Sequence, residues 1–155
     1  AVADIIAVME KGRIEQRETP ENLYAHPANE RVARFLGFSN IMDGIVLPEG
    51  TIRTDIGVLH HVDHDFLPGA GVRVLVRPDA ARIPNEGEEP GERETIVKGA
   101  VKSCLFRGRN YHLELLSGTG QVLAFELSNE SRPSPAGSSL EIALSPSAVV
   151  IMPHA

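Results

Sequence analysis

Tryptophan is absent from the 155 residues, aromatic side chains make up only 5% of them, and cysteine occurs once, at Cys104. The core must therefore rest on aliphatic side chains, because these few rings cannot build a large aromatic cluster. A single cysteine excludes a disulfide framework within the chain and is more typical of a small core residue than of a reactive thiol. Such sparse use of cysteine fits a reducing compartment.

An excess of basic residues is also missing, since 15 lysines and arginines stand against 21 acidic residues and the formal net charge is −6. A nucleic-acid-binding domain needs a basic face that neutralises phosphates, and a single-strand binder needs aromatic stacking platforms. Both requirements argue against nucleic acid as a partner, and the charge argues against docking on an anionic membrane. No apolar run of membrane-spanning length and no signal peptide are recognisable.

Catalytic motifs are missing as well. The sequence contains no G-x-x-x-x-G-K-[ST] phosphate loop, no G-x-S-x-G nucleophile elbow, and neither an H-E-x-x-H nor a C-x-x-C pair. Phosphate binding, nucleophilic catalysis and zinc chemistry each need residues at these spacings, so no catalytic hypothesis follows from motifs. The sequence alone therefore does not indicate an enzyme.

What the sequence does contain is a pair of similar segments. Residues 72–84 alternate between apolar and charged side chains until Pro78, which ends the strand because proline has no N–H for a ladder. Residues 140–153 repeat this arrangement around Pro146 at a constant offset (146 − 78 = 68). Alanine and isoleucine recur at the matching later positions. Such a copy predicts two similar halves within one compact all-β body.

The rest of the chain predicts a β-hairpin and two short helices before this body. The hairpin is expected at 4–10 and 13–18, and the helices begin at Thr19-Pro20 and Asn29-Glu30, which are N-cap signals. The division is 1–38 and 39–155. Strands are expected at 41–47, 51–56, 58–62, 72–77, 95–106 with a bend at Gly99, 111–115, 121–127 and 140–144, and an acidic mobile loop at 85–94.

His60 and His64 are the only candidates for a metal site, and they are weak ones. In a continuous strand they would share a face, with a carboxylate from Asp63 or Asp65 nearby. A metal site needs three or four converging ligands, however, and a solvated strand end explains the same residues. The metal interpretation is therefore the minor alternative.

Three arginines are candidates for an anion pocket. Arg77 precedes Pro78 at the end of the repeated strand, and Arg107 and Arg109 flank a glycine in a turn that ends at Asn110. Guanidinium groups together with backbone N–H groups can bind an oxyanion, although most surface arginines are simply solvated. These five residues are the sequence's candidates for a ligand or interface site.

Residues 1–37 carry the first recognisable resemblance. The segments Ala3-Asp4, Ile6–Gln16, Thr19–Tyr24, Pro27–Asn29 and Val32–Gly37 resemble, in order and spacing, the end of the nucleotide-binding domain of ABC importer ATPases. The match departs from that pattern at Ile5 and at Arg17-Glu18. Residues 1–38 would then be the C-terminal tail of an ATPase domain.

The remaining residues resemble the accessory, TOBE-like C-terminal domain found in the polyamine, iron, sulfate and sugar branch of these importers. The resemblance is carried by Val74–Asp79 and by Gly99–Tyr111. It implies a mainly β fold, an OB-type β-barrel built from two similar halves. In such proteins the phosphate loop, signature, Walker B acid and switch histidine lie upstream, so this piece is expected to be non-catalytic, with ATP and Mg²⁺ bound only by the intact protein.

The resemblance also implies partners. We expect a regulatory and dimerisation domain of an ATP-binding subunit that powers solute import, at the inner face of the membrane through permease subunits. The alternative is a module that senses a small oxyanion or metal ion, and a regulator protein is a further possible partner. The hairpin is apolar and two strands alone are marginal in water, so we expect either a homodimer or a hairpin folded onto the barrel.

Overall fold

The computed structural model describes residues 4–131 and 134–154. Ala3 of the ATPase-like segment and residues 132–133 of the last loop lie outside this part. The described residues form twelve strands and three helical segments: β1 (Ile6–Glu10), β2 (Arg13–Glu18), α1 (Pro20–Ala25), α2 (Glu30–Phe35), β3 (Ile41–Val46), β4 (Ile52–Thr54), β5 (Gly57–Leu59), β6 (Gly71–Val76), β7 (Ala81–Arg82), β8 (Thr95–Phe106), β9 (Asn110–Ser117), β10 (Val122–Ser128), β11 (Ser139–Leu144), the 3₁₀ helix η1 (Pro146–Ala148) and β12 (Val149–Pro153).

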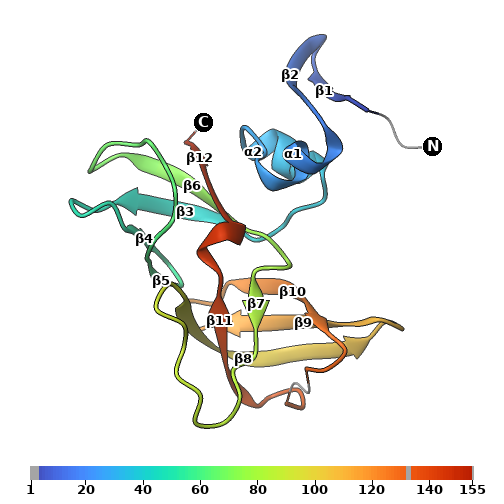
Figure 1. Cartoon of the computed structure of the whole chain (residues 1–155), viewed down its shortest axis with the longest axis vertical. Coiled ribbons are helices and arrows are strands. Elements are labelled where there is room, and N and C mark those ends of the chain that lie inside the picture. Colours follow the sequence, from blue (N-terminus) through green and yellow to red (C-terminus); the bar gives the residue numbers. More distant parts are fainter. Residues whose placement is uncertain (1–3, 132–133, 155) are drawn as a thin grey trace.

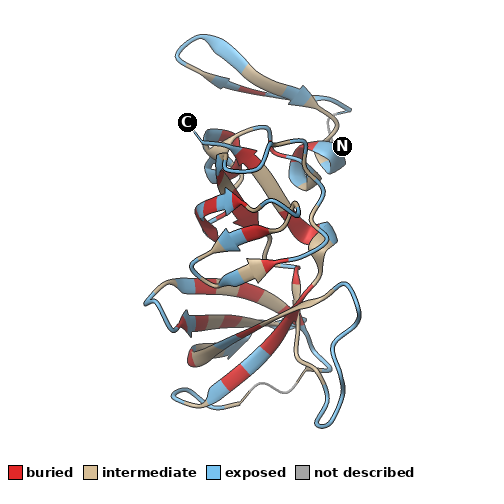
Figure 2. Cartoon of the chain, turned by 90° about the vertical axis from the view of Figure 1, so that its left-hand side faces the viewer, coloured by how far each residue is buried: buried red, intermediate tan, exposed pale blue. Residues whose placement is uncertain are grey.

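The predicted hairpin and helices are present. Strands β1 and β2 pair antiparallel through the turn at Lys11-Gly12. Helix α1 begins at Pro20, with the Thr19 hydroxyl accepting the N–H of Asn22 at 3.3 Å. Helix α2 is capped in the same way by the Asn29 side chain. Figure 2 shows the hairpin projecting beyond the helices, at the end of the molecule away from the sheets.

Two five-stranded sheets form the body of the molecule (Figure 1), in the orders β12-β6-β3-β4-β5 and β10-β9-β8-β11-β7. When the second order is reversed, the strands of the two sheets correspond one to one: β3 to β8, β4 to β9, β5 to β10, β6 to β11 and β12 to β7. The first half, β3 to β7, keeps four strands in one sheet and places β7 in the other. The second half does the reverse with β12. The fold is therefore mainly β and built from two similar halves, as predicted.

Hydrogen bonds at the two proline turns confirm that these turns are copies. The Arg77 N–H donates to the Ala148 carbonyl at 3.0 Å, and the Ser145 N–H donates to the Ala80 carbonyl at 2.9 Å. The two donors are related by the offset of 68 (77 + 68 = 145), and so are the two acceptors (80 + 68 = 148), so each turn donates to the other in the same way. The two turns thus hold each other at the point where the chain crosses between the sheets.

The core fills the space between the two sheets with aliphatic side chains and one fully buried aromatic residue, Phe125. Close packing here depends on two glycines in matching strands. A Cβ on Gly44 of β3 would lie 2.8 Å from the Ile52 and Val74 methyl groups, and one on Gly99 of β8 would lie 2.6 Å from the Leu116 carbonyl oxygen. Both contacts are shorter than real side chains tolerate, so each site requires glycine.

The helical segment packs on the outer face of the first sheet. Ala33, Phe38, Ile41, Leu75 and Met152 form a second buried cluster there. Val8, Leu23 and Val32 form a third cluster, which attaches the hairpin to the two helices. Of the two arrangements expected for the hairpin, folding onto the barrel is not what the structure shows, because the hairpin packs on α1 and α2.

An ion-pair network fixes α2 to the sheet beneath it. Arg73 of β6 donates to both carboxylate oxygens of Glu30, at 2.9 Å each, and to Asp43 of β3 at 2.7 Å. The Arg73 hydrogen bonds are the main cause that lowers the pKa of the Glu30 carboxyl, and they also lower the pKa of Asp43. Both carboxylates therefore stay ionised to lower pH than usual, so their ion pairs with Arg73 persist at neutral pH and below it.

Asn40 joins the start of β3 to the opposite sheet. Its side chain is buried, its amide group donates to the carbonyls of Val76 at 2.9 Å and Ala124 at 2.8 Å, and its oxygen accepts the Ala124 N–H at 2.8 Å. Strand β10 lies at the edge of its sheet, so the Asn40 side chain, rather than another strand, pairs with the N–H and carbonyl of Ala124. Thr95, the first residue of β8, holds the equivalent position (40 + 55 = 95), and its hydroxyl accepts the His60 backbone N–H at 3.5 Å.

One local prediction was wrong. The strand expected at 58–62 ends at Leu59, and His61 adopts a positive φ of 59°, outside the extended range of a strand. The long strand expected at 95–106 is confirmed as β8, and its register shifts between Val101 and Ser103. The bend expected at Gly99 stays a prediction, and what the structure shows there is a close approach to Leu116.

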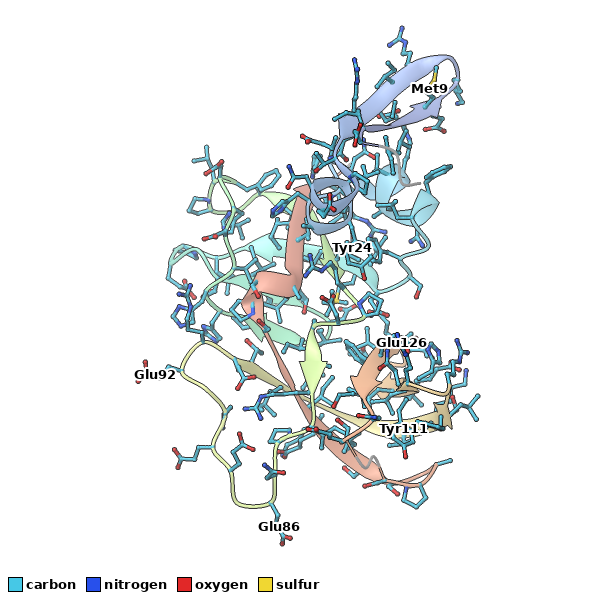
Figure 3. The ribbon with its side chains drawn as sticks, turned by 45° about the vertical axis from the view of Figure 1, so that its right-hand side comes forward. Met9, Tyr24, Glu86, Glu92, Tyr111 and Glu126 are labelled. Atoms are coloured by element: carbon cyan, nitrogen blue, oxygen red, sulfur yellow. The ribbon has the colours of Figure 1, made fainter. Side chains whose placement is uncertain are left out.

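The acidic segment 85–94 folds around one arginine. Arg82 donates to Glu94 twice at 2.7 Å and to Glu88 at 2.8 Å, and Glu94 also accepts the Gly91 N–H. Figure 3 shows Glu86 and Glu92 pointing away from the sheets on the same segment. Mobility, which the composition predicts for this segment, stays a prediction, but its two ends are held by these bonds.

Replacing Gly99 by alanine should destabilise the chain by about 2–3 kcal/mol, because a backbone oxygen cannot move out of the way of the new methyl group. Gly44→Ala should cost somewhat less, about 1–2 kcal/mol, since its neighbours are side-chain methyls. Gly71→Ala is the matched control, because nothing lies within 4 Å of its Cβ position. Urea unfolding measures all three, and equal stabilities for Gly99→Ala and Gly71→Ala would contradict the packing described.

Replacing Asn40 by alanine should cost about 2–4 kcal/mol, since it leaves a buried N–H and two carbonyls of the barrel without partners. Asn129, which is exposed, provides the control substitution Asn129→Ala. Hydrogen exchange should show the loss locally, as faster exchange of the Ala124 amide. Unchanged protection of that amide in Asn40→Ala would show that Asn40 does not secure β10.

Candidate functional site

Arg77 lies between the helices and the barrel. Its guanidinium carbon is 5.5 Å from the centre of the Tyr24 ring, and its Nε donates to Asp79 Oδ1 at 3.1 Å. Only 13% of the Arg77 side chain is exposed. A cation over an aromatic face and an ion pair both stabilise this position, so Arg77 is committed to contacts within the chain.

The residues around Arg77 form a polar cluster that links four elements. Pro78 contributes its carbonyl, which accepts the N–H of Glu126 in β10, and Glu126 in turn accepts from His112 Nδ1 at 2.7 Å. Figure 3 shows Tyr24 and Glu126 on the same side of the molecule. Burial, followed by the Asp79 carboxylate, raises the pKa of the Tyr24 hydroxyl above its ordinary value. The hydroxyl therefore stays protonated near neutral pH.

Arg107, Arg109 and Asn110 occupy the tip of the β8–β9 hairpin and are exposed. The Arg107 N–H donates to the Asn110 carbonyl at 2.8 Å, which closes the turn. Among residues 4–131 and 134–154 these two arginines share no hydrogen bond or ion pair with Arg77. The structure thus separates the predicted anion candidates into one engaged arginine and two at a solvent-exposed turn.

The tip also carries apolar surface. Leu105 and Phe106 are 57% and 58% exposed, and the Phe106 ring lies 5.2 Å from that of Tyr111. Cys104, just before them, is partly buried, and burial raises the pKa of its thiol. A thiol that stays protonated is a poor nucleophile, in keeping with a packing role.

His60 and His64 line one pocket, together with Glu49, Gly50, Thr51, His61 and Val62. The His60 N–H reaches Thr95, whereas His64 uses both ring nitrogens, one facing the Gly50 carbonyl at 2.7 Å and the other accepting the Phe66 N–H at 3.2 Å. A ring with both nitrogens occupied has none left for a metal. The described residues contain no group of three or more histidine, cysteine or acidic side chains that could hold a metal ion.

Sequence reasoning missed Tyr24, Glu126, His112 and Asn40. The signal for Asn40 was present, because I-M-D-G-I-V after Asn40 and I-V-K-G-A-V after Thr95 share isoleucine, glycine and valine at the same spacing. Tyr24 and Glu126 carry no comparable signal, since their meeting depends on how α1 packs on the barrel. No helix in the described part of the chain is long and apolar enough to cross a membrane.

The family model of the TOBE domain matches residues 74–152, from β6 into β12 and across both proline turns. The chain belongs to the TOBE domain family. This match confirms the accessory-domain resemblance carried by Val74–Asp79 and Gly99–Tyr111.

Relatives with this domain include two proteins described as spermidine/putrescine import ATP-binding protein PotA. That of Clostridioides difficile is 35% identical over 116 residues, which are 74% of this chain and 31% of the relative. That of Acetivibrio thermocellus is 36% identical over 110 residues, 71% of this chain and 30% of the relative. The chain therefore corresponds to about a third of the length of the curated relatives it matches.

A solved structure supports the fold of the TOBE chain. The cytoplasmic molybdate-binding protein ModG, in a crystal form with molybdate bound, has a TM-score of 0.60 over 76% of this chain and 97% of its own. Sequence identity is only 18%, so this likeness shows the OB-type fold and nothing about ligands.

Proposed function

We propose that this chain acts as the non-catalytic regulatory and dimerisation domain of an ATP-binding subunit of an ABC importer. The TOBE match, together with the 35% identity to import ATP-binding proteins, supports this proposal. ATP and Mg²⁺ would be bound by the ATPase part of such a subunit, and permease subunits would hold it at the inner face of the membrane. The division at residues 38 and 39 separates the ATPase tail from the regulatory domain.

The hairpin provides a structural reason for an association of this kind. Val8 on its inner face is buried against the helices, whereas Ile5, Met9 and Ile14 on the hairpin are 47%, 58% and 59% exposed. Met9 and Ile14 are also direct cross-strand partners. A two-stranded sheet with an exposed apolar face and two unpaired edges favours pairing with another sheet. In an intact subunit the ATPase domain would cover this face, and in the isolated chain a second copy would.

Sensing of a small oxyanion is the second candidate function, and the molybdate bound in the ModG structure is the observation that favours it. Arg77, Pro78, Arg107, Arg109 and Asn110 stay the candidate residues for such a site or for a regulator protein. Arg107 and Arg109 are the accessible ones, because Arg77 is engaged with Asp79 and Tyr24.

Light scattering at micromolar concentration should give the isolated chain a mass of twice 16.8 kDa. The double substitution Met9→Glu with Ile14→Glu should return it to a monomer, because it places charges on the apolar face of the hairpin. Leu67→Glu is the matched control, since Leu67 is 77% exposed elsewhere on the molecule. A monomeric wild-type chain would contradict the dimer.

The importer role can be tested with a chimaera. In the Clostridioides difficile relative, the matched 116-residue portion is replaced by the corresponding part of this chain, and spermidine uptake and ATP hydrolysis are measured in vesicles with its permease. The chimaera should support uptake, because the exchanged domain is non-catalytic, and a relative cut before this portion should support less. This chain alone should release no phosphate from ATP. Phosphate release by the pure chain, or a chimaera no better than the truncated relative, would refute the proposal.

A further inference from the structure

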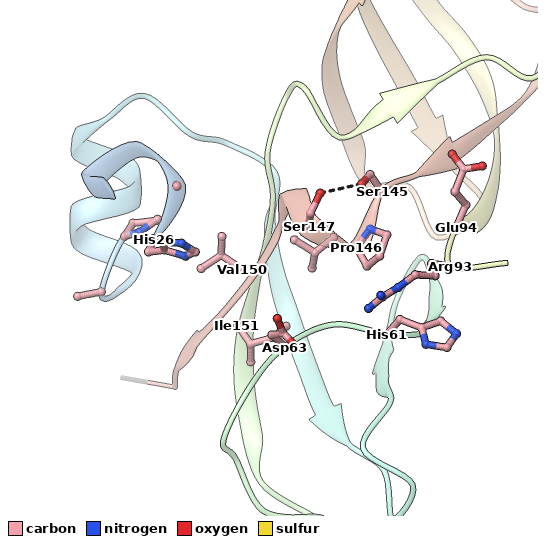
Figure 4. A pocket seen from close by; sticks show the side chains of 14 residues that line it. His26, His61, Asp63, Arg93, Glu94, Ser145, Pro146, Ser147, Val150 and Ile151 are labelled. Atoms are coloured by element: carbon pink, nitrogen blue, oxygen red, sulfur yellow. Dashed lines mark hydrogen bonds between the residues drawn. The ribbon is translucent and has the colours of Figure 1, made fainter. Parts of the chain in front are cut away.

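A cavity of about 630 Å³ lies beside the second proline turn. It is bounded by the connection between α1 and α2, the loop that follows β5, the residues before β8, and the first residues of β12. Its apolar lining comes from Pro27, Pro146, Val150 and Ile151. Figure 4 shows His26 at one end and Arg93 with His61 at the other, with Asp63 between them. The cavity is therefore lined by apolar side chains together with a few polar and charged ones.

Comparison of the two turns shows what opens the space. Ser145 and Ser147 occupy the positions that Arg77 and Asp79 hold in the first copy (77 + 68 = 145; 79 + 68 = 147). In the first copy the long side chains form an ion pair that packs on Tyr24, whereas in the second copy the two hydroxyls bond to each other at 2.9 Å. The backbone hydrogen bonds of both turns are the same, so small side chains are not needed for the turn itself.

Two opposite charges face this cavity without partners. Arg93 and Asp63 make no side-chain hydrogen bond and no ion pair within residues 4–131 and 134–154, and they are not within 4.0 Å of each other although they line the same cavity. Glu94, the other carboxylate there, is fully used by Arg82 and the Gly91 N–H. The available charges are thus one guanidinium and one carboxylate.

We propose that this cavity binds a small zwitterion with an apolar body, its carboxylate at Arg93 and its ammonium group at Asp63. A simple anion would meet the Asp63 carboxylate, and a simple cation would meet the Arg93 guanidinium. A molecule with both charges satisfies both residues, while its hydrocarbon part lies on the proline and valine surface. Ligand pockets of a few hundred Å³ with an apolar lining and a few polar groups are typical for small molecules.

Three matched probes test the charge requirement on the full 155-residue chain by isothermal titration calorimetry. L-leucine carries both charges, 4-methylpentanoate lacks the ammonium group, and 3-methylbutylamine lacks the carboxylate. L-leucine should bind about three- to fivefold more tightly than either, which is the gain expected from one solvent-exposed ion pair. Equal affinities for the three probes, or no binding of L-leucine, would overturn the proposal.

Variants locate the site. Arg93→Gln should lower L-leucine affinity to that of the amine, and Asp63→Asn to that of the carboxylate. Because both residues are exposed, these changes should leave folding intact. Ser145→Arg with Ser147→Asp rebuilds the first-copy ion pair and should abolish binding, with circular dichroism as the check on folding. Arg53→Gln and Asp55→Asn are the matched controls, because both residues are exposed and lie outside the cavity, and they should change nothing.

Molybdate is titrated separately in the same way, as the probe for the alternative of oxyanion sensing. Molybdate binding that Arg93→Gln weakens, without any binding of L-leucine, would overturn the zwitterion proposal in favour of oxyanion sensing. None of these outcomes depends on whether the chain works in an importer, since all are measured on the isolated chain.

Discussion

The exchange of one strand between two halves is the constraint on which the rest of this structure depends. Each sheet needs β7 or β12 from the other half, and the crossing is held by the paired bonds between Arg77 and Ala148 and between Ser145 and Ala80. The proline that follows each donor ends the strand and allows the chain to change sheets. The shared aliphatic core and the packing of the helical segment on Met152 of β12 both require this crossing.

Much of this architecture could be predicted, because the two proline turns have kept the same residue pattern at a fixed offset of 68. The match between Gly44 and Gly99 was not found, because its offset is 55 (99 − 44 = 55). Strands β9 and β10 have 8 and 7 residues, whereas β4 and β5 have 3 each. A lengthened hairpin in the second half changes the offset part-way, so a search at constant spacing finds only the last part of the repeat.

The candidate site was less predictable. Arg77 was identified from its position before the proline, but its contact with Tyr24 depends on the packing of α1, which no local pattern encodes. The strand expected to carry His60 and His64 on one face ends at Leu59, because the positive φ of His61 turns the chain, although both histidines line one pocket. The family resemblance predicted the fold class well, since it rests on whole segments rather than on single side chains.

The reciprocal crossing has a consequence for how such a molecule could arise. A chain with only one of these halves would lack the fifth strand of its sheet and could complete it only from a second molecule, so its folding would depend on concentration. Joining the two halves in one polypeptide makes strand donation intramolecular, with the high effective concentration of a linked partner. Two identical subunits would necessarily carry identical turns. Once fused, the halves were free to differ, which is why one turn can hold an arginine–aspartate pair while its twin holds two serines.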